Sequence, residues 1–600
     1  MRRTGKRALT FGALVGCVAL ALAPPTAPEA HAWDPSTTHL GLTDRAALES
    51  AVHLRWMASS EFQRGLFTAL RVDPDRLRRD EWRLFMQTAS NAHASSGVRP
   101  LGGPGACPGA DAPPVTSRYC VEGDLWQLSA LQWLEFGVLA ELTPPAREVH
   151  HFVDPDNRDA PRWRARGEAL PPLVLRSRQT RHNGGSTAEQ LTRTGFAGDG
   201  PSAAAWLADD GDPLAPARMF EHLELAYLAA DADARDHHLA LALVCAGALL
   251  HVGQNLAVPA HARADVAAFF RNLSHHRADR GLPLQELARL RYGRSDLPIV
   301  RSAAEVAAQR GTLPAASLHD LLLGRLRDGD AGLAEYTRAR FLSSGTLPPP
   351  MAIDLEQSDT DAAATLLEGS MLDPAELVGA HLSPWPADRG YVLSGAGRPL
   401  MAFATDEDGF VRAFLDDAVY DDQLLRLLPR ALDTSRAMLD AIFPAWPQIQ
   451  VRMGAGTLEF ELDAALESPE LLVLTQTADG KRAIAMKVTL LPGKRNRVRG
   501  LPTELPKDGR LVLVLRAQRK GGDPVLLEHV LAPDAAEIKP MPAQVSAAPE
   551  PAEAAAGEDD DEDAEEDAEE DAEDAEEDEE DAEDAPAESG TSDPETAPAG

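Results

Sequence analysis

Histidines and carboxylates that could bind a metal ion recur along the first half of this chain. The stretch HVGQNLAVPAH holds His251, Asn255 and His261 and directly follows an apolar run at 239–250. Residues four apart share one face of a helix, so His251 and Asn255 can address one point. Pro259 would end the helix and turn the chain before His261. Imidazole and carboxylate groups are the ligands expected for Zn²⁺.

Further candidate ligands lie on both sides of this stretch. His39 comes near the start of a helical pattern, and His151 lies in VHHFVDPDN. His275 and Asp279 repeat the four-residue spacing. A single helical histidine usually has a structural role, and DPDN is a good turn sequence, so each element alone is a weak signal. The ordered set is what indicates a metal site.

The first 32 residues are typical of a secretory signal peptide. A basic start is followed by an apolar stretch, and Ala30-His31-Ala32 matches an A-x-A cleavage site. Cleavage after Ala32 would make Trp33 the N-terminus, and its α-amine and carbonyl could chelate a metal. Lipid anchoring at Cys17 is the alternative, but apolar residues continue beyond it. We therefore expect a secreted or periplasmic protein.

This ordered set resembles the zinc-dependent phospholipase C / S1-P1 nuclease superfamily, over roughly residues 33 to 290. The resemblance implies an exported all-α domain that binds up to three zinc ions. It also implies a phosphodiester hydrolase in which zinc-bound hydroxide attacks phosphorus. The HFVDPDN block is similar to the phospholipase C branch, whereas the short interval from Trp33 to His39 and the aspartate at 279 are similar to the nuclease branch. The implied metal ligands are Trp33, His39, His151, His251, Asn255, His261, His275 and Asp279.

Two positions depart from the family pattern. Asn255 stands where the family has an aspartate that bridges two metals, and Leu142 stands where another aspartate precedes the His-Phe block. Glu141 is our candidate for a substitute with a catalytic role, although its helical position predicts a different direction for its side chain. A catalytically impaired relative that binds metal or protein, an S1/P1-type nuclease and a purely structural protein therefore stay open as alternatives.

The elements that would position these residues divide into a helical and a β-rich part. Apolar spacings of three and four predict an all-α domain over 33–345. A mixed, mainly helical connecting region follows at 346–445. The predicted helices are 43–57, 125–142, 219–230, 237–256 and 318–326, and the connecting region is expected to hold a short hairpin within 390–412 and a helix over 431–443 just after Pro429.

Short alternating runs from Ile449 predict a small antiparallel β-sandwich at 446–535. The runs are 457–462, 470–477, 483–491, 510–518 and 525–531. By analogy, this domain could be a membrane- or calcium-responsive module that gives peripheral membrane contact. Residues 541–600, rich in Ala, Glu and Asp, are expected to form a disordered acidic tail.

Charge and cysteine content narrow the function further. The net charge is −36, and 27 acidic residues from Glu550 onward account for most of it. No basic stripe suits duplex nucleic acid, so phospholipid is the favoured substrate. Cys107 and Cys120 could form a disulfide in an exported protein, whereas Cys245 is expected to be a buried free thiol. The apolar run at 239–250 is too short to span a bilayer and predicts a buried helix.

Overall fold

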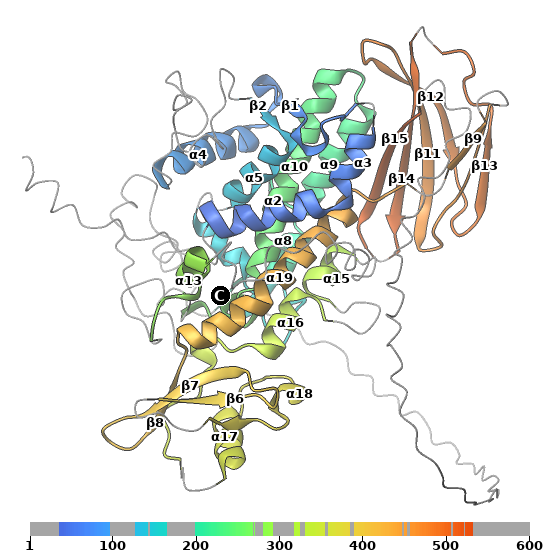
Figure 1. Cartoon of the computed structure of the whole chain (residues 1–600). Coiled ribbons are helices and arrows are strands. Elements are labelled where there is room, and N and C mark those ends of the chain that lie inside the picture. Colours follow the sequence, from blue (N-terminus) through green and yellow to red (C-terminus); the bar gives the residue numbers. More distant parts are fainter. Residues whose placement is uncertain are drawn as a thin grey trace, which may run out of the picture. The chain divides into compact units, whose positions relative to one another are not determined.

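The computed structural model places helices in the first part of the chain and most of its strands after residue 380 (Figure 1). It describes residues 35–59, 61–95, 126–141, 145–164, 199–267, 269, 280–291, 317–324, 331–353, 358–383, 389–446, 449–452, 456–505, 508–520 and 522–531. The predicted signal peptide, the cysteine pair and the acidic tail lie outside these residues. A helical region followed by a sheet region is compatible with the expected fold class, while the exact domain boundaries stay predictions. The helical region is not all-α as expected, because β1 (Ala69–Arg71) pairs with β2 (Gln127–Ser129) and β3 (Arg162–Arg164) pairs with β4 (Asp199–Pro201).

Helices occur in the segments in which periodicity predicted them, with two differences in their bounds. The helix expected over 43–57 is two helices separated at Ser50, and the helix expected over 125–142 begins at Ala130. The principal helices of the helical region are α2 (Leu40–Glu49), α3 (Ala51–Ala58), α4 (Arg79–Ser95), α5 (Ala130–Glu141), α9 (Pro216–Leu228), α10 (Ala232–Asn255), α13 (Leu284–Arg291), α15 (Leu318–Leu322) and α16 (Leu333–Arg340). Shorter turns are η1 (Pro35–His39), η4 (Pro145–His151), α8 (Ala203–Leu207) and α11 (Pro259–Ala262). These short turns carry several of the candidate ligands.

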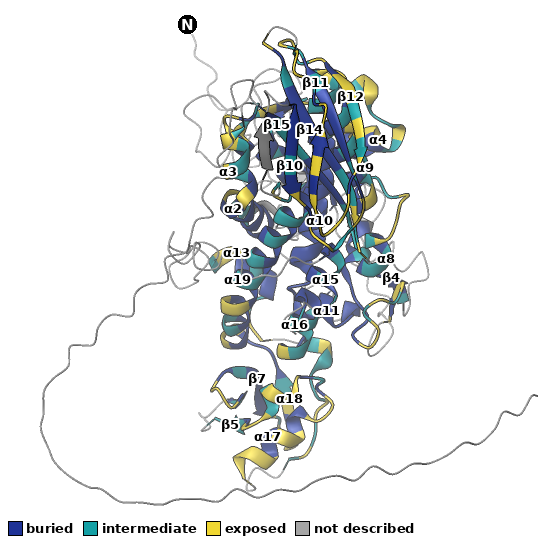
Figure 2. Cartoon of the chain, turned by 90° about the vertical axis from the view of Figure 1, so that its right-hand side faces the viewer, coloured by how far each residue is buried: buried dark blue, intermediate teal, exposed yellow. Residues whose placement is uncertain are grey.

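Helix α10 is the central element of this region. The side chain of Asp231 caps it by accepting a hydrogen bond from the backbone N–H of Ala234 at 2.7 Å. Nearly every residue from Leu239 to Asn255 is buried, as Figure 2 shows in dark blue. The helix is long and apolar enough to cross a membrane, but 89% of its most apolar window is buried inside the protein. The core of the helical region therefore accounts for its composition. Cys245 is a buried free thiol, as expected.

Helices α5 and α10 approach closely through two glycines. A Cβ atom on Gly137 would overlap the carbonyl oxygen of Val244, and one on Gly247 would overlap that of Leu134. Only hydrogen fits at these two positions, so the backbones touch. Because Glu141 and His251 each lie one helical turn beyond a contact glycine, both point along the facing sides of the two helices.

The connecting region differs from its prediction in one helix. Helix α19 runs from Asp417 to Ile442 and contains Pro429 in its interior, so the expected start at 431 was wrong. A proline at 429 leaves the carbonyl of Leu425 without its helical donor. The Leu425 side chain is 40% exposed, which places that carbonyl on the solvent side where water can satisfy it.

The hairpin expected within 390–412 belongs to a larger antiparallel sheet. Its strands are β5 (His381–Leu382), β6 (Gly390–Leu393), β7 (Pro399–Thr405) and β8 (Val411–Phe414), paired in that order. Helices α17 (Asp359–Leu367) and α18 (Pro374–Leu377) precede it in the chain. The prediction of a hairpin is therefore confirmed and extended by two strands.

All five predicted strands of the C-terminal region are present, in two antiparallel sheets. One sheet has the order β12-β11-β14-β15 and the other β13-β10-β9. The strands are β9 (Ile449–Arg452), β10 (Thr457–Glu461), β11 (Leu466–Gln476), β12 (Arg482–Thr489), β13 (Arg495–Arg499), β14 (Arg510–Arg519) and β15 (Pro524–Leu531). Both sheets contribute to one buried apolar cluster, which includes Leu458, Val473 and Leu513.

A buried ion network attaches the sheet β12-β11-β14-β15 to the helical region. The guanidinium of Arg482 contacts Glu528 at 2.5 Å and Glu61 at 3.2 Å. It also donates a hydrogen bond to the backbone carbonyl of Tyr227 at 3.2 Å. Replacing either Arg482 or one of its two glutamates by a neutral residue would leave a buried charge without its partner. The contact between the sheet and the helical region therefore depends on these particular residues.

We predict that Gly247→Ala destabilises the protein, because its methyl group would force α5 and α10 apart. Overpacking of this kind costs about 1–3 kcal/mol of unfolding free energy. Gly253→Ala in the same helix is the matched control, since its methyl would meet only side-chain atoms of Leu322 and Met438, at 3.0 and 3.1 Å. Urea unfolding measures both variants. Equal stabilities would contradict the proposed backbone contact.

Candidate metal centre

Three buried side chains bring possible metal ligands to one point. A donor atom from each of Glu148, His151 and His251 lies within 4.8 Å of the other two. Glu148 and His151 come from η4, which follows α5, and His251 comes from the last turn but one of α10. The exposures of the three are 2%, 0% and 0%. We call these three residues the metal triad.

Backbone contacts fix the segment that carries His151. The N–H of Val153 donates to the carbonyl of His261 at 3.0 Å, and the N–H of Ala203 donates to the carbonyl of Phe152 at 3.1 Å. The Phe152 ring stacks on the His261 ring with centroids 4.1 Å apart. These two backbone hydrogen bonds and the ring stacking hold the His-Phe block between α8 and α11.

His39 lies against the triad from the N-terminal side. Its ring stacks on His251 with centroids 3.9 Å apart, and its Nδ1 lies 2.6 Å from Oε1 of Gln254. Gln254 in turn donates to the Thr43 hydroxyl at 3.1 Å. This chain of contacts orients the His39 ring from two helices, α2 and α10.

Asn255 lies between two histidines of the triad. Its side-chain Nδ2 is 2.5 Å from Nδ1 of His151 and 3.0 Å from Nε2 of His251. A half-turn of the amide exchanges its NH₂ group for its oxygen, so Asn255 can serve as donor or acceptor. A carboxylate here would only accept. The amide therefore holds the two rings without supplying negative charge.

His261 completes the cluster with its hydrogen-bonding capacity unused. Among the described residues, neither of its ring nitrogens has a hydrogen-bond partner, although both are buried. Oε1 of Glu148 and Oδ1 of Asn255 are likewise buried without one. Nε2 of His261 lies 3.4 Å from Oε1 of Glu148. Buried polar atoms are normally satisfied, so this concentration of them is typical of a site that binds an ion or a ligand.

Glu141 reaches the cluster but is tied to a buried ion pair. Its Oε1 lies 3.3 Å from Nε2 of His151, and its Oε2 accepts a hydrogen bond from Arg147 at 2.7 Å. Arg147 also makes two contacts with Asp212, at 2.8 and 2.9 Å. The expectation that Glu141 points elsewhere was wrong, because Glu141 lies one helical turn beyond Gly137, on the side of α5 that faces α10. This geometry orients His151; a catalytic role for Glu141 stays a prediction.

The electrostatics of the cluster separate two of its histidines. Burial lowers the pKa of His151, but hydrogen bonds and charge from Glu141 and Glu148 outweigh it and raise this pKa to about 9. Burial and the neighbouring His151 and His39 hold the pKa of His261 well below its ordinary value. Without a metal, His151 therefore carries the positive charge that the surrounding carboxylates require.

This donor set fits a zinc ion. Zinc takes imidazole nitrogen and carboxylate oxygen, usually four ligands in a tetrahedral arrangement. Glu148, His151 and His251 would supply three, and His261 is available beside them with both nitrogens unused. A divalent cation would also replace the proton on His151 as the compensating charge.

The structure brings together six of the predicted site residues. They are His39, Glu141, His151, His251, Asn255 and His261, and all are buried. Trp33, His275 and Asp279 lie outside the described residues, as does Leu142. Sequence reasoning missed Glu148. Its signal was present, because Glu148 precedes His151 by three residues and such a pair meets on one side of a helical turn.

Comparison with known proteins does not show the family of this chain. No protein-family model matches the chain, and neither does any curated protein. Among solved structures, the chain is similar to "Alpha Toxin from Clostridium Absonum", with 10% sequence identity and a TM-score of 0.23. The match covers 83% of this chain and 100% of that one.

We predict that zinc binding releases about one proton at neutral pH. A protonated His151 cannot coordinate, and its pKa of about 9 means that zinc must displace the proton at any lower pH. Apparent zinc affinity should thus rise about tenfold per pH unit from pH 6 to 8 and level off above pH 9. Titration calorimetry in buffers of different ionisation enthalpy measures the proton count. An affinity independent of pH would contradict the charge assignment.

Proposed function

We propose that this chain is a zinc-dependent phosphodiester hydrolase of the phospholipase C type, secreted or periplasmic. The observation that carries the proposal is the convergence of the metal triad, Glu148, His151 and His251, at a buried point with unsatisfied polar atoms around it. His39, Asn255 and His261, expected from the family pattern, gather at the same point. Residues from four separate elements meet there, which an accidental order of histidines would not explain.

The side chains around the triad have distinct tasks in this proposal. Glu148, His151 and His251 would hold the ion, and Glu141, itself fixed by Arg147, would keep the His151 ring in position. A bound zinc ion supplies Lewis acidity, polarising a phosphoryl oxygen and making an attacking water more acidic. Up to three ions belong to the family pattern, and this triad accounts for one of them.

Phospholipid is the substrate class that we favour over nucleic acid. The His-Phe-Val-Asp-Pro block is similar to the phospholipase C branch, and the sequence shows no basic stripe for a duplex. We further propose that the two C-terminal sheets form a β-sandwich that gives peripheral membrane contact. The S1/P1-type nuclease stays an alternative, since the interval from Trp33 to His39 resembles that branch.

Two observations favour a second candidate, a metal-binding relative without turnover. His151, His251 and His261 each have 0% exposure, so substrate has no open route to the triad among the described residues. Asn255 replaces a charged bridging ligand by a neutral amide. Such a protein would bind zinc tightly and hydrolyse nothing. Metal analysis combined with an activity assay distinguishes it from the proposed hydrolase.

We predict that His251→Ala lowers zinc affinity by on the order of 100-fold or more, because it removes a ligand and not only a neighbour of one. His381→Ala is the matched control, since His381 lies on β5 and its Nδ1 contacts the carbonyl of Gly379 in the preceding turn, at 3.0 Å. Metal analysis of the purified chains and release of phosphocholine from phosphatidylcholine are the two readouts. If the two variants keep equal zinc, the triad is not the binding site.

We predict that Asn255→Asp increases zinc affinity by about tenfold or more, since a carboxylate adds charge between His151 and His251. Hydrolysis should rise with metal content if the neutral amide limits turnover. Competition with a chromophoric chelator gives the affinity. An unchanged affinity would show that position 255 does not address the metal.

A further inference from the structure

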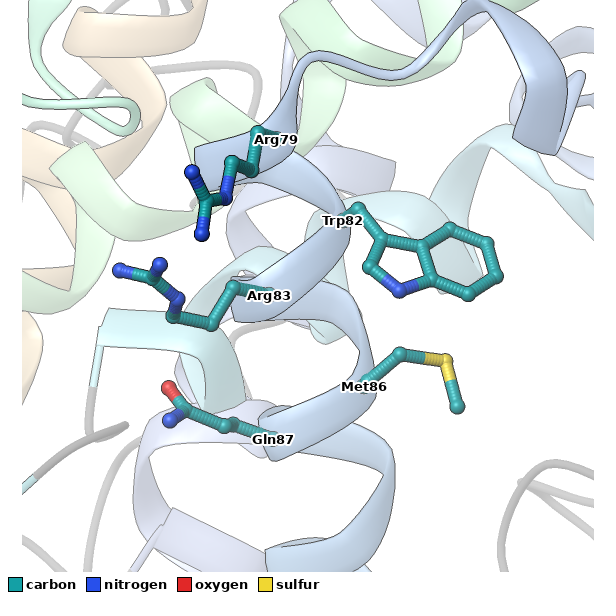
Figure 3. Close-up of a pocket in the computed structure, with 5 residues that line it drawn as sticks. All are labelled: Arg79, Trp82, Arg83, Met86 and Gln87. Carbon is teal, nitrogen blue, oxygen red and sulfur yellow. The ribbon is translucent and has the colours of Figure 1, made fainter.

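Helix α4 presents a cationic and apolar face on an otherwise acidic protein. The exposed residues of its first ten positions are Arg79, Trp82, Arg83, Met86 and Gln87. They line one surface pocket (Figure 3). The only acidic residues in this stretch are Asp80, which is half-buried, and Glu81, which is buried. We call the five exposed residues the α4 face.

The α4 face has two adjacent rows that follow the helical repeat. Arg79, Arg83 and Gln87 are spaced four apart, and Trp82 and Met86 form the neighbouring row. Figure 3 shows the two rows side by side along the helix, with Arg79, Arg83 and Gln87 on the left and Trp82 and Met86 on the right. The apolar side chains are 43% and 46% exposed, although burying them would be favourable.

The opposite side of α4 anchors the helix firmly. Leu84 and Phe85 are buried in the main apolar core, and Phe85 packs against Phe136 of α5 with ring centroids 4.8 Å apart. Trp82 itself stacks on Trp126 with centroids 5.7 Å apart. The α4 face is therefore displayed by a rigid scaffold, which lowers the entropic cost of binding a partner.

We propose that the α4 face binds the surface of an anionic phospholipid membrane. An interfacial helix of this kind places tryptophan and methionine among the lipid headgroups and arginine against phosphate and anionic lipid. Tryptophan prefers this interface because one part of its ring system is apolar and its N–H is polar. The four residues that matter, Arg79, Trp82, Arg83 and Met86, supply both parts of this chemistry from one helix face.

Two other partners fit the α4 face less well. A single-stranded nucleic acid needs free aromatic faces on which bases stack, but one face of Trp82 is covered by Trp126, and Met86 offers no ring. The chain's own acidic segment beyond Glu550 would suit the arginines and leave both apolar side chains exposed. A membrane surface uses the charged and the apolar row together.

The test is co-sedimentation of the full chain with phosphatidylcholine vesicles, with and without phosphatidylglycerol, in the presence of a chelator. We expect binding to the anionic vesicles. Arg79→Gln with Arg83→Gln should weaken it roughly 30-fold, the effect of two arginines near an anionic surface. Trp82→Ala should weaken it several-fold at either lipid composition. Because the chelator prevents turnover, the result does not depend on the proposed hydrolase.

The matched control removes two exposed arginines outside both α4 and the C-terminal sheets, by Arg412→Gln with Arg426→Gln, and should bind like the unchanged protein. His251→Ala should also bind normally, which separates membrane docking from the metal centre. The proposal is overturned if the α4 variants sediment like the unchanged protein, or if no binding occurs. It is also overturned if these variants lose binding to an oligothymidine strand while vesicle binding persists.

Discussion

The contact between Gly137 of α5 and Gly247 of α10 is the constraint on which the candidate site depends. It removes the side-chain layer that normally separates two packed helices, so their backbones meet. One turn further along each helix lie Glu141 and His251. The closeness of the helices is what lets η4, entering directly after α5, place His151 within reach of both residues.

The second constraint is electrostatic. Glu141 and Glu148 are buried carboxylates that face His151. Within the described part of the chain, Arg147 pairs with Glu141, and no lysine or arginine pairs with Glu148. A buried charge without a partner is costly, so Glu148 and its neighbours require positive charge nearby. A proton on His151 supplies it in the metal-free chain, and a divalent cation would supply more. The ring nitrogens of His261 favour the divalent cation over the proton. A proton on His151 leaves both of these nitrogens without a hydrogen-bond partner among the described residues, whereas a cation could bind one of them.

Many of the helices and strands were predictable from periodicity, because each of them buries one face and this face appears as regularly spaced apolar residues within the element itself. Helix α10 and the strands β10, β11, β12, β14 and β15 follow their apolar runs closely. The short strand β13, RNRVR, was missed because charged residues alternate with only two inward-facing ones, Asn496 and Val498. Helix α19 began earlier than predicted because a proline is tolerated where the freed carbonyl faces solvent.

The candidate site was predictable in its members but not in its contacts. The order of His39, His151, His251 and His261 identified residues that the structure brings together. Glu148 could have been found from its spacing, because it precedes His151 by three residues. The partnership of Glu141 with Arg147 depends on how η4 follows α5, which no spacing rule gives. In the same way, the α4 face appears in the sequence as an ordinary amphipathic pattern, and its exposed half is informative only once burial is known.

The central claim is that Glu148, His151 and His251 hold one metal ion. Anomalous diffraction at the zinc absorption edge, from crystals of the full chain grown with zinc, tests it most directly. The account predicts an anomalous peak within coordination distance of all three side chains, about 2.0–2.2 Å from the donor atoms. Zinc peaks found elsewhere but not at these three side chains, or no zinc peak while the side chains keep their positions, would contradict it.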